Sequence, residues 1–371
     1  MTLARHEYFW ADEIIFGARF PALKRRAKLT SALRVVRQMT LPLKQSYPPM
    51  EAKSVAQLPS GADWQYEPKW DGFRCLAFRD GDQVDLQSKS GQPLGRYFPE
   101  LVEALLKLKP KQFVLDGEIV VPVDGRLSFD DLLMRIHPAA SRVQKLSKEH
   151  PATLIVFDLL VDDRGKSLVE LHLSERRKKL DAFAKKYFAK NKSIELSPET
   201  KDLKIAKGWL AGAGGDVDGV IAKRLDLPYQ SDNRNGMVKV KRLRTADCVV
   251  GGFRYATEGK LVGSLLLGLY DDDGLLHHVG FTSSFKASEK AALTKKVEAL
   301  IKPPGFTGRA PGGPSRWSTD RSAEWKPLAP RLVIEVQYDH FTGGRFRHGT
   351  KFLRWRPDKK ASQCRMEQVE N

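Results

Sequence analysis

The pattern of apolar residues changes near Thr245 and Ala246, and this change limits the folds that the chain can adopt. Before it, apolar runs rich in β-branched residues alternate with segments at helical spacing, such as FVLDGEIVV, TLIVFDLLV and LSERRKKLDAFAKKY. After it, short strand-like runs are separated by glycine and aspartate, with one helix expected around 289–301. A chain of 371 residues is long enough for two domains with separate cores.

We therefore expect an α+β fold with two domains. The domain over 46–245 should have antiparallel sheets and flanking helices, including a hairpin with its turn at 80–82. The domain over 246–371 should be a small all-β barrel of the OB type, because it offers about five strands and one helix.

Residues 1–45 differ from the rest of the chain. They contain RRAKLTSALRVVRQ, which is basic and weakly amphipathic, and they have no signal-peptide apolar region. We expect a poorly ordered or mis-started extension, with a natural beginning near Met39. A basic arm that grips DNA or a targeting presequence is the alternative.

The charge of the chain indicates which class of partner it binds, and its cysteines indicate the cellular compartment. Lys and Arg outnumber Asp and Glu by 63 to 45, giving a formal charge of +18, which favours nucleic acid before an anionic membrane. A basic surface that only faces solvent would give the same excess of Lys and Arg. Cys75, Cys248 and Cys364 form no CxxC pair, so no zinc site is predicted and a reduced, cytoplasmic location is expected. No apolar run is long enough for a membrane span.

The stretch EPKWDGFR places Lys69 just before an Asp-Gly pair. Trp70 and Phe73 offer apolar cover, and Arg74 a neighbouring cation, two conditions that help a lysine lose its proton and act as a nucleophile. The same sequence also fits a surface lysine before an ordinary turn. Short motifs match by chance at a high rate.

Further segments follow in order, and each is ambiguous alone. LDGEIV places Glu118 after a buried strand and a turn, as a ribose acceptor or a plain loop acid. VFDLL places Phe157 in a strand, where it stacks on a base or fills the core. DGVIAKR offers Asp218 for a divalent cation. Lys239 and Lys241 share one face of a strand, where they clamp a phosphate or face solvent.

The ordered set KWDGFR, SKSG, LDGEIV, VFDLL, DGVIAKR and KVK resembles the motifs of covalent nucleotidyltransferases, and most closely those of ATP-dependent DNA ligases. The resemblance runs from about Met50 to Lys360 and is strongest to compact bacterial ligases related to end-joining enzymes. FRHGTKFLRWRPDK is similar to the last motif of the family. The resemblance implies a nucleotidyltransferase (ATP-grasp-like ligase) domain, an OB-fold domain, and sealing of nicks with ATP and Mg²⁺ or Mn²⁺.

The resemblance also implies roles for the matching residues. Lys69 would carry AMP, Glu67 would contact the adenine, and Phe157 would stack on it. Arg74 and Glu118 would hold the ribose, and Glu118 and Asp218 would take the metal-binding places. Contacts with the α-phosphate and the leaving pyrophosphate would come from a mostly basic set: Lys239, Lys241, Arg354, Arg356, Asp358 and Lys359.

Two positions depart from the family pattern. Lys89 stands where the second motif usually has arginine, so the charge is kept but the planar fork, and with it a firm contact to ribose or the nick terminus, is lost. Asp218 stands where glutamate is usual, which shortens the reach of the carboxylate by one methylene. Both substitutions keep the chemical group that the motif requires.

The resemblance implies nicked double-stranded DNA as the substrate, held mainly through its phosphates. Residues 340–360 contain seven Lys or Arg and one acid, and no helix-turn-helix or finger signature is present.

We expect a monomer in DNA repair or recombination, with a Ku-type end-bridging protein as a candidate partner and no membrane contact. The alternatives are an RNA ligase, a capping-type guanylyltransferase, and a non-catalytic DNA-binding relative.

Overall fold

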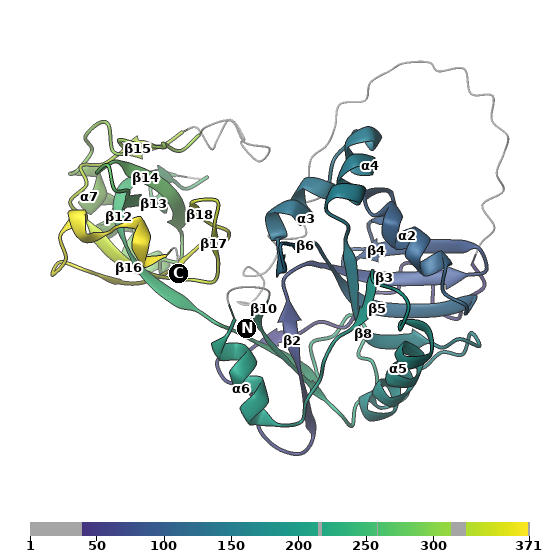
Figure 1. Cartoon of the computed structure of the whole chain (residues 1–371). Coiled ribbons are helices and arrows are strands. Elements are labelled where there is room, and N and C mark those ends of the chain that lie inside the picture. Colours follow the sequence, from purple (N-terminus) through teal and green to yellow (C-terminus); the bar gives the residue numbers. More distant parts are fainter. Residues whose placement is uncertain (1–38, 214–216, 258, 313–323, 370–371) are drawn as a thin grey trace. The chain divides into compact units, whose positions relative to one another are not determined.

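The computed structural model describes residues 39–213, 217–257, 259–312 and 324–369, which form two compact units (Figure 1). Unit 1 ends at Lys241 and unit 2 begins at Arg242, a few residues before the boundary predicted at 245 and 246. The difference arises because the strand β12 (Arg244–Tyr255) begins earlier than expected. Its first residue already pairs with β16 (Val333–Tyr338) of unit 2.

Unit 1 contains a five-stranded sheet in the order β4-β3-β5-β8-β9. Its strands are antiparallel except for β8 and β9, which run parallel. The bounds are β3 Phe73–Asp80, β4 Gln83–Ser88, β5 Gln112–Val120, β8 Thr153–Val161 and β9 Ile194–Leu196. The hairpin predicted around 80–82 is therefore the β3–β4 pair.

Both faces of this sheet are buried, which explains why its strands are continuously apolar. Along β3, Cys75 and Ala77 belong to a core cluster that includes residues of α2 (Pro99–Leu106) and α5 (Leu173–Tyr187). The alternate residues Leu76 and Phe78 belong to a second cluster on the other side of the strand.

A separate four-stranded sheet has the order β1-β11-β10-β2. Its bounds are β1 Lys53–Ser54, β2 Trp64–Trp70, β10 Val217–Arg224 and β11 Met237–Lys241. The helix α6 (Leu203–Ala211) packs on it through a small cluster of Tyr66, Ala206, Val220 and Ala222. The remaining elements of unit 1 are the short 3₁₀ helix η1 Gly95–Tyr97, β6 Pro122–Val123, β7 Arg126–Leu127, α3 Phe129–Arg135 and α4 Ala140–Glu149.

Unit 2 is built on a six-stranded sheet in the order β14-β13-β12-β16-β19, with β15 paired to β12. Thr282 at the end of β14 bridges to Thr350, directly before β19, so the first and last strands of the path meet and the sheet curls into a barrel. The other bounds are β13 Val262–Tyr270, β14 Leu276–Thr282, α7 Lys290–Glu298, β15 Lys326–Pro327, β17 Phe341–Thr342, β18 Arg345–Phe346 and β19 Lys351–Trp355. The predicted small barrel with one helix is confirmed.

The segment from Met39 to residue 45 belongs to unit 1, although the sequence placed it in the basic extension. Leu41 and Leu43 are buried in the same cluster as Leu76 and Phe78. The two leucines are separated by a proline in a short irregular stretch, so no periodicity marks them as core residues. The part of the extension from 1 to 38 lies outside the described residues.

All three cysteines are buried free thiols, in agreement with the absence of paired spacing in the sequence. Within the described ranges, no helix is both long enough and apolar enough to cross a membrane.

Candidate active site

Lys69 lies on β2 beside a carboxylate from the neighbouring strand. Its Nζ is 2.6 Å from Oδ2 of Asp218, and the same oxygen is 3.2 Å from Nζ of Lys241. The register between β2 and β10 shifts at Asp218, because Trp70 faces Val217 while Lys69 already faces Gly219. Such an irregularity re-aims the side chain of the extra residue. Asp218 thereby reaches both ammonium groups and is only 4% exposed.

Lys239 and Lys241 lie on β11, two residues apart, and both face β10. The pKa of Lys239 is lowered to about 8, first by burial and then by the positive charges of Lys69 and Lys241. Lys89 adds to the same effect from the end of β4. The structure therefore brings together four of the five lysines singled out from the sequence, all of them in unit 1. A group with several negative charges would be stabilised among them.

Arg74 and Glu118 are direct cross-strand neighbours on β3 and β5. Glu118 was expected after a turn, and this expectation is wrong: the Asp-Gly pair before it continues the strand. A Cβ at Gly117 would come within 2.7 Å of the backbone oxygen of Ile155, so glycine is needed there for the close approach of β8. Burial raises the pKa of Glu118 to about 7, against the lowering effect of Arg74 and Lys69.

The guanidinium of Arg74 is held by a buried carboxylate, that of Asp116, to which the sequence motifs assign no role. Its Nε and Nη2 donate to the two oxygens of Asp116 at 2.5 and 2.6 Å, and Asp116 is fully buried. The hydroxyl of Tyr229 donates to Asp116 at 2.6 Å and accepts from the backbone N–H of Met50 at 2.9 Å. Asp116 was visible in LDGEIV but was taken for part of a turn, whereas no sequence signal marks Tyr229.

Phe157 lies at a second register irregularity, where β8 passes β5. Asp116 pairs with Asp158 and Gly117 with Val156, so Phe157 is the extra residue between them. Its ring is approached by the Arg74 guanidinium at 4.5 Å and by Nζ of Lys223 at 4.6 Å from the centroid. Side chains from the five-stranded and the four-stranded sheets of unit 1 thus converge at Phe157.

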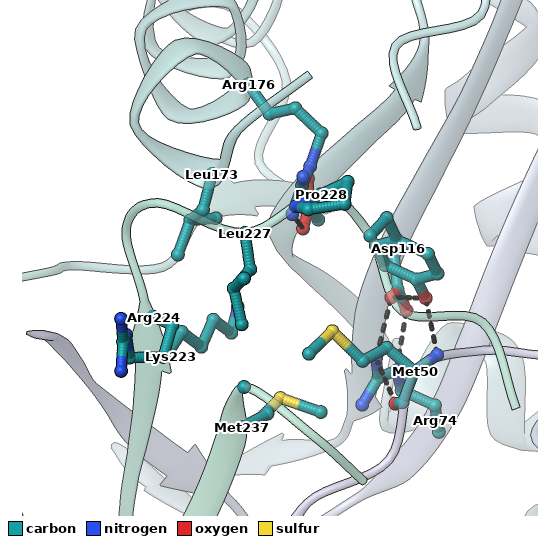
Figure 2. A pocket seen from close by; sticks show the side chains of 13 residues that line it. Met50, Arg74, Asp116, Leu173, Arg176, Lys223, Arg224, Leu227, Pro228 and Met237 are labelled. Atoms are coloured by element: carbon teal, nitrogen blue, oxygen red, sulfur yellow. Dashed lines mark hydrogen bonds and ion pairs between the residues drawn. The ribbon is translucent and has the colours of Figure 1, made fainter. Parts of the chain in front are cut away.

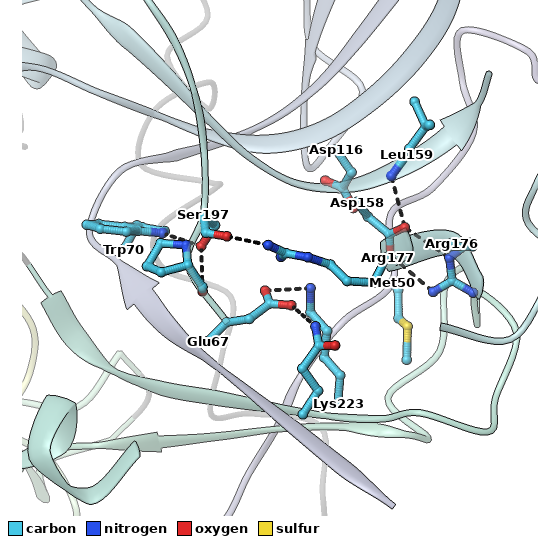
Figure 3. Close-up of polar contacts among 12 residues, drawn as sticks. Met50, Glu67, Trp70, Asp116, Asp158, Leu159, Arg176, Arg177, Ser197 and Lys223 are labelled. Atoms are coloured by element: carbon cyan, nitrogen blue, oxygen red, sulfur yellow. Dashed lines mark hydrogen bonds and ion pairs between the residues drawn. The ribbon is translucent and has the colours of Figure 1, made fainter. Parts of the chain in front are cut away.

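Glu67 forms a buried ion pair with Lys223, another residue to which the sequence gave no role (Figure 3). The distance is 2.7 Å, and the exposed fractions of the two side chains are 2% and 8%. The side-chain amide of Gln65 also donates to Glu67 at 2.8 Å. Lys223 is the lysine of DGVIAKR, so its motif was recognised while its own contact was not.

Lys89 is the most exposed of the predicted unit 1 residues for which an ion pair is described. Its Nζ lies 3.0 Å from Glu51, which also accepts from Nε of Arg234 at 2.9 Å. Lys89 therefore has a defined carboxylate partner, although its side chain is shorter than the usual arginine and lacks the planar fork. The partner, Glu51, lies in the segment that leads into β1.

A cavity in unit 1 lies beside these groups (Figure 2). Asp116 and Arg74 line one part of it, and Lys223 lines another. Figure 2 also shows the apolar side chains that close it, among them Met50, Leu173, Leu227, Pro228 and Met237. The lining joins fixed charges to apolar surface around a free volume of about 10 Å³, which is room for about one water molecule.

The four predicted residues of the C-terminal motif lie in unit 2, and each has a partner there. Arg354 pairs with Glu335 at 2.6 Å. Arg356 binds Asp247 through Nη1 at 2.8 and 2.9 Å and also pairs with Asp358 at 2.8 Å. Lys359 binds Asp247 at 2.8 Å. Asp247 and Glu335 were not identified from the sequence.

Comparison with known proteins identifies the family that carries this arrangement. Residues 49–241 match the model of the ATP dependent DNA ligase domain, and residues 258–359 match the model of the ATP dependent DNA ligase C terminal region. The chain belongs to the ATP-dependent DNA ligase family. The activity expected from the sequence, ATP-dependent DNA ligation, is confirmed at this level.

Named relatives agree with the family assignment. The chain is 44% identical to DNA ligase C2 of Mycolicibacterium smegmatis, over 90% of this chain and 97% of the relative. It is 42% identical to DNA ligase C of Mycobacterium tuberculosis, over 90% and 96%. A solved structure from a study of Lig E DNA ligases shares the fold, with a TM-score of 0.51 at 16% identity, over 83% of this chain and 99% of that one. The relatives confirm the expected likeness to compact bacterial ligases.

Proposed function

We propose that Lys69 is the nucleophile of this ligase and that the unit 1 cluster holds ATP for its attack. The ammonium group of Lys69 first gives up a proton to water, which leaves a neutral amine. Nζ then bonds to the α-phosphorus of ATP while the bond to the bridging oxygen of the β-phosphate breaks, and pyrophosphate leaves. A second proton is lost to water from the nitrogen of the new N–P bond. A 5′-phosphate oxygen at a nick then attacks the same phosphorus and displaces Lys69. Finally the 3′-hydroxyl attacks the activated 5′-phosphate, and AMP leaves.

The contact that carries this proposal is the ion pair of Lys69 with Asp218, shared with Lys241. It places the candidate nucleophile at a fixed, partly buried point, with Lys239 and Lys241 on the adjoining strand. These cations would offset the negative charge of the α-phosphate as it is attacked. The base would stack on Phe157 and meet Glu67 with its edge, next to the charged groups of Arg74 and Lys223.

Arg74 and Glu118 would hold the ribose, and Lys89 would contact the ribose or the nick terminus. The fixed partners of two of these groups support this: Asp116 orients Arg74, and Glu51 orients Lys89. Arg354, Arg356, Asp358 and Lys359 of unit 2 would orient the leaving pyrophosphate, with the segment around Arg244 and Thr245 as the hinge between steps.

The residues present fit a divalent cation. Glu118 and Asp218 offer carboxylate oxygens, the ligands that Mg²⁺ and Mn²⁺ prefer, and both carboxylates lie within the electrostatic field of Lys69. When bound, the ion would supply Lewis-acid stabilisation of the phosphate charge. Because the pKa of Glu118 is about 7, a share of the molecules holds this proton at neutral pH, and binding of the cation would displace it.

The biological substrate would be a nick in double-stranded DNA, gripped through its phosphates by the basic surface. Relatives at 31% identity over 306 residues are named as multifunctional non-homologous end joining proteins. We place this chain in DNA repair on that basis, acting as a monomer, with a Ku-type end-bridging protein as its candidate partner.

A chase experiment tests the proposal. Protein freed of bound nucleotide is mixed with Mg²⁺ and ATP labelled at the α-phosphate, and nicked DNA or the matching nicked RNA duplex is then added. Label should pass from protein to the 5′ end of the DNA and then be released as AMP as the nick is sealed. Labelling with GTP in place of ATP would indicate a capping-type enzyme, and preferential sealing of RNA would indicate an RNA ligase. An RNA preference or GTP use would contradict the proposal.

A further inference from the structure

Two acidic residues on neighbouring strands of unit 2 hold the basic C-terminal motif. Asp247 on β12 and Glu335 on β16 face each other directly in the strand register. Glu335 binds Arg354, which is its own neighbour on β19. Asp247 binds two cations at once: Arg356 through both of its carboxylate oxygens, and Lys359.

The two acidic residues differ in how firmly they are fixed. Arg354 is 64% exposed, so its pair with Glu335 is an ordinary surface ion pair of small energetic value. Asp247 is 12% exposed, and its cationic partners Arg356 and Lys359 are 18% and 24% exposed. Partial burial makes the Asp247 contacts stronger and more directional than those of Glu335.

Asp247 is also held through its backbone. Its N–H donates to the side-chain oxygen of Gln368 at 2.9 Å, and the amide nitrogen of Gln368 donates back to the Asp247 carbonyl at 3.0 Å. On the other side, the backbone N–H of Arg356 donates to the carbonyl of Val333 at 2.8 Å. The carboxylate and the segment it binds are therefore both anchored to the barrel.

We propose that Asp247 is a positioning residue for the adenylation step, a role that rests on the proposed contacts of Arg356 and Lys359 with pyrophosphate. Two cations that converge on one polyanion repel each other and tend to separate. A carboxylate shared between them offsets that repulsion and fixes both side chains before ATP arrives. Such preorganisation lowers the barrier because the cations need not be gathered during the reaction.

The proposal predicts which steps depend on Asp247. Pyrophosphate is a product of lysine adenylation and a reactant in its reversal. It takes no part when the enzyme joins a nick that already carries AMP on its 5′-phosphate. Loss of Asp247 should therefore slow adenylation and its reversal, and should affect the joining of a pre-adenylated nick much less.

The test uses Asp247→Asn in the full chain, because asparagine keeps the size and one acceptor oxygen but removes the charge. We expect single-turnover adenylation to fall about tenfold or more, and the KM for pyrophosphate in the reverse reaction to rise by a similar factor. Joining of a pre-adenylated nick should change less than about threefold. The control is Asp272→Asn, which removes an exposed carboxylate that pairs with Arg365 at 2.7 Å, and all three rates should stay as in the wild type.

A second variant separates this inference from the function on which it rests. If Asp247 acts through Arg356 and Lys359, then adding Asp247→Asn to a chain that already carries Arg356→Ala and Lys359→Ala should cost little further adenylation rate. Equal losses in all steps of Asp247→Asn would show a merely structural role and overturn the inference. It would also be overturned if Arg356→Ala slowed adenylation while Asp247→Asn did not. Full adenylation in Arg356→Ala would remove the pyrophosphate role itself, and with it the inference.

Discussion

The ammonium nitrogen of Lys69 lies 2.6 Å from Oδ2 of Asp218, which is 4% exposed. A buried carboxylate next to the candidate nucleophile can hold the lysine at one point and balance its charge before ATP binds. The same oxygen contacts Lys241, so one carboxylate links the proposed nucleophile to the proposed phosphate clamp. A single acidic residue on β10 therefore contacts two of the proposed site residues.

Replacement of that carboxylate should be costly. Asp218→Asn removes the charge shared by Lys69 and Lys241, and with it a proposed metal ligand, so self-adenylation at saturating ATP should fall on the order of 100-fold. Asp226→Asn is the matched control, because Asp226 pairs with Arg224 just after the same strand but is 47% exposed. Rapid-quench measurement of labelled protein checks both variants. Similar rates in wild type and Asp218→Asn would argue against the assigned role.

Glu118 makes the stability of the protein depend on pH in a defined direction. The folded chain keeps a proton on Glu118 up to about pH 7, whereas the ordinary pKa is 4.5. The resulting stabilisation is full below the ordinary pKa and is lost as pH rises through about 7. Glu118→Gln does not titrate, so between pH 5 and 8 its unfolding free energy should gain about 1–3 kcal/mol relative to wild type. Urea unfolding at several pH values would show this, and parallel pH curves for the two proteins would refute it.

The network around Asp116 should contribute strongly to the stability of unit 1. Asp116→Ala leaves Arg74 and Tyr229 without their shared acceptor inside the protein, and should cost about 3–5 kcal/mol of unfolding free energy. Asp181→Ala, which breaks a pair with Arg177 at a 48% exposed carboxylate, should cost less than about 1 kcal/mol. Denaturant titration measures the unfolding free energy of both variants. Equal losses would show that the buried Asp116 network stabilises the protein no more than an exposed ion pair does.

The start of the folded core can be located by truncation. A chain that begins at Met39 should keep nick sealing, because it retains Leu41 and Leu43 of the buried cluster in unit 1. A chain that begins at Met50 loses the buried Leu41 and Leu43, each worth about 1.5–3 kcal/mol. Melting temperature and sealing rate should therefore drop only for the shorter protein. Loss of DNA binding in the Met39 protein would instead support the basic-arm alternative.

Elements with strong local patterns could be predicted from the sequence. The helix expected from LSERRKKLDAFAKKY is α5, Leu173–Tyr187, because its apolar residues recur at helical spacing and pack on the five-stranded sheet. The turn predicted before Glu118 was wrong, and it was predicted because Asp-Gly is a typical turn dipeptide. Its glycine serves instead to let β8 approach β5 closely, a requirement that only the paired strand reveals.

Contacts between distant residues could not be predicted. Asp116 and Tyr229 are 113 residues apart, and Arg356 and Asp247 are 109 apart. No local periodicity links such pairs, and a carboxylate in a strand looks the same whether it faces solvent or a guanidinium. The motifs thus singled out candidate cations such as Arg74, Arg354 and Arg356. Only the structure shows which acidic residues hold these three cations: Asp116, Glu335 and Asp247.

Adenylation of Lys69→Arg is the most direct measurement of the central claim. Arginine keeps the positive charge beside Asp218, but it cannot act as a nucleophile at neutral pH because it stays protonated. With α-labelled ATP and Mg²⁺, the wild-type chain should become labelled, with AMP mapped to the peptide containing Lys69. Neither Lys69→Arg nor Lys69→Ala should take up label, while both keep the wild-type melting profile. Label on the folded Lys69→Arg chain would show that another residue is the nucleophile.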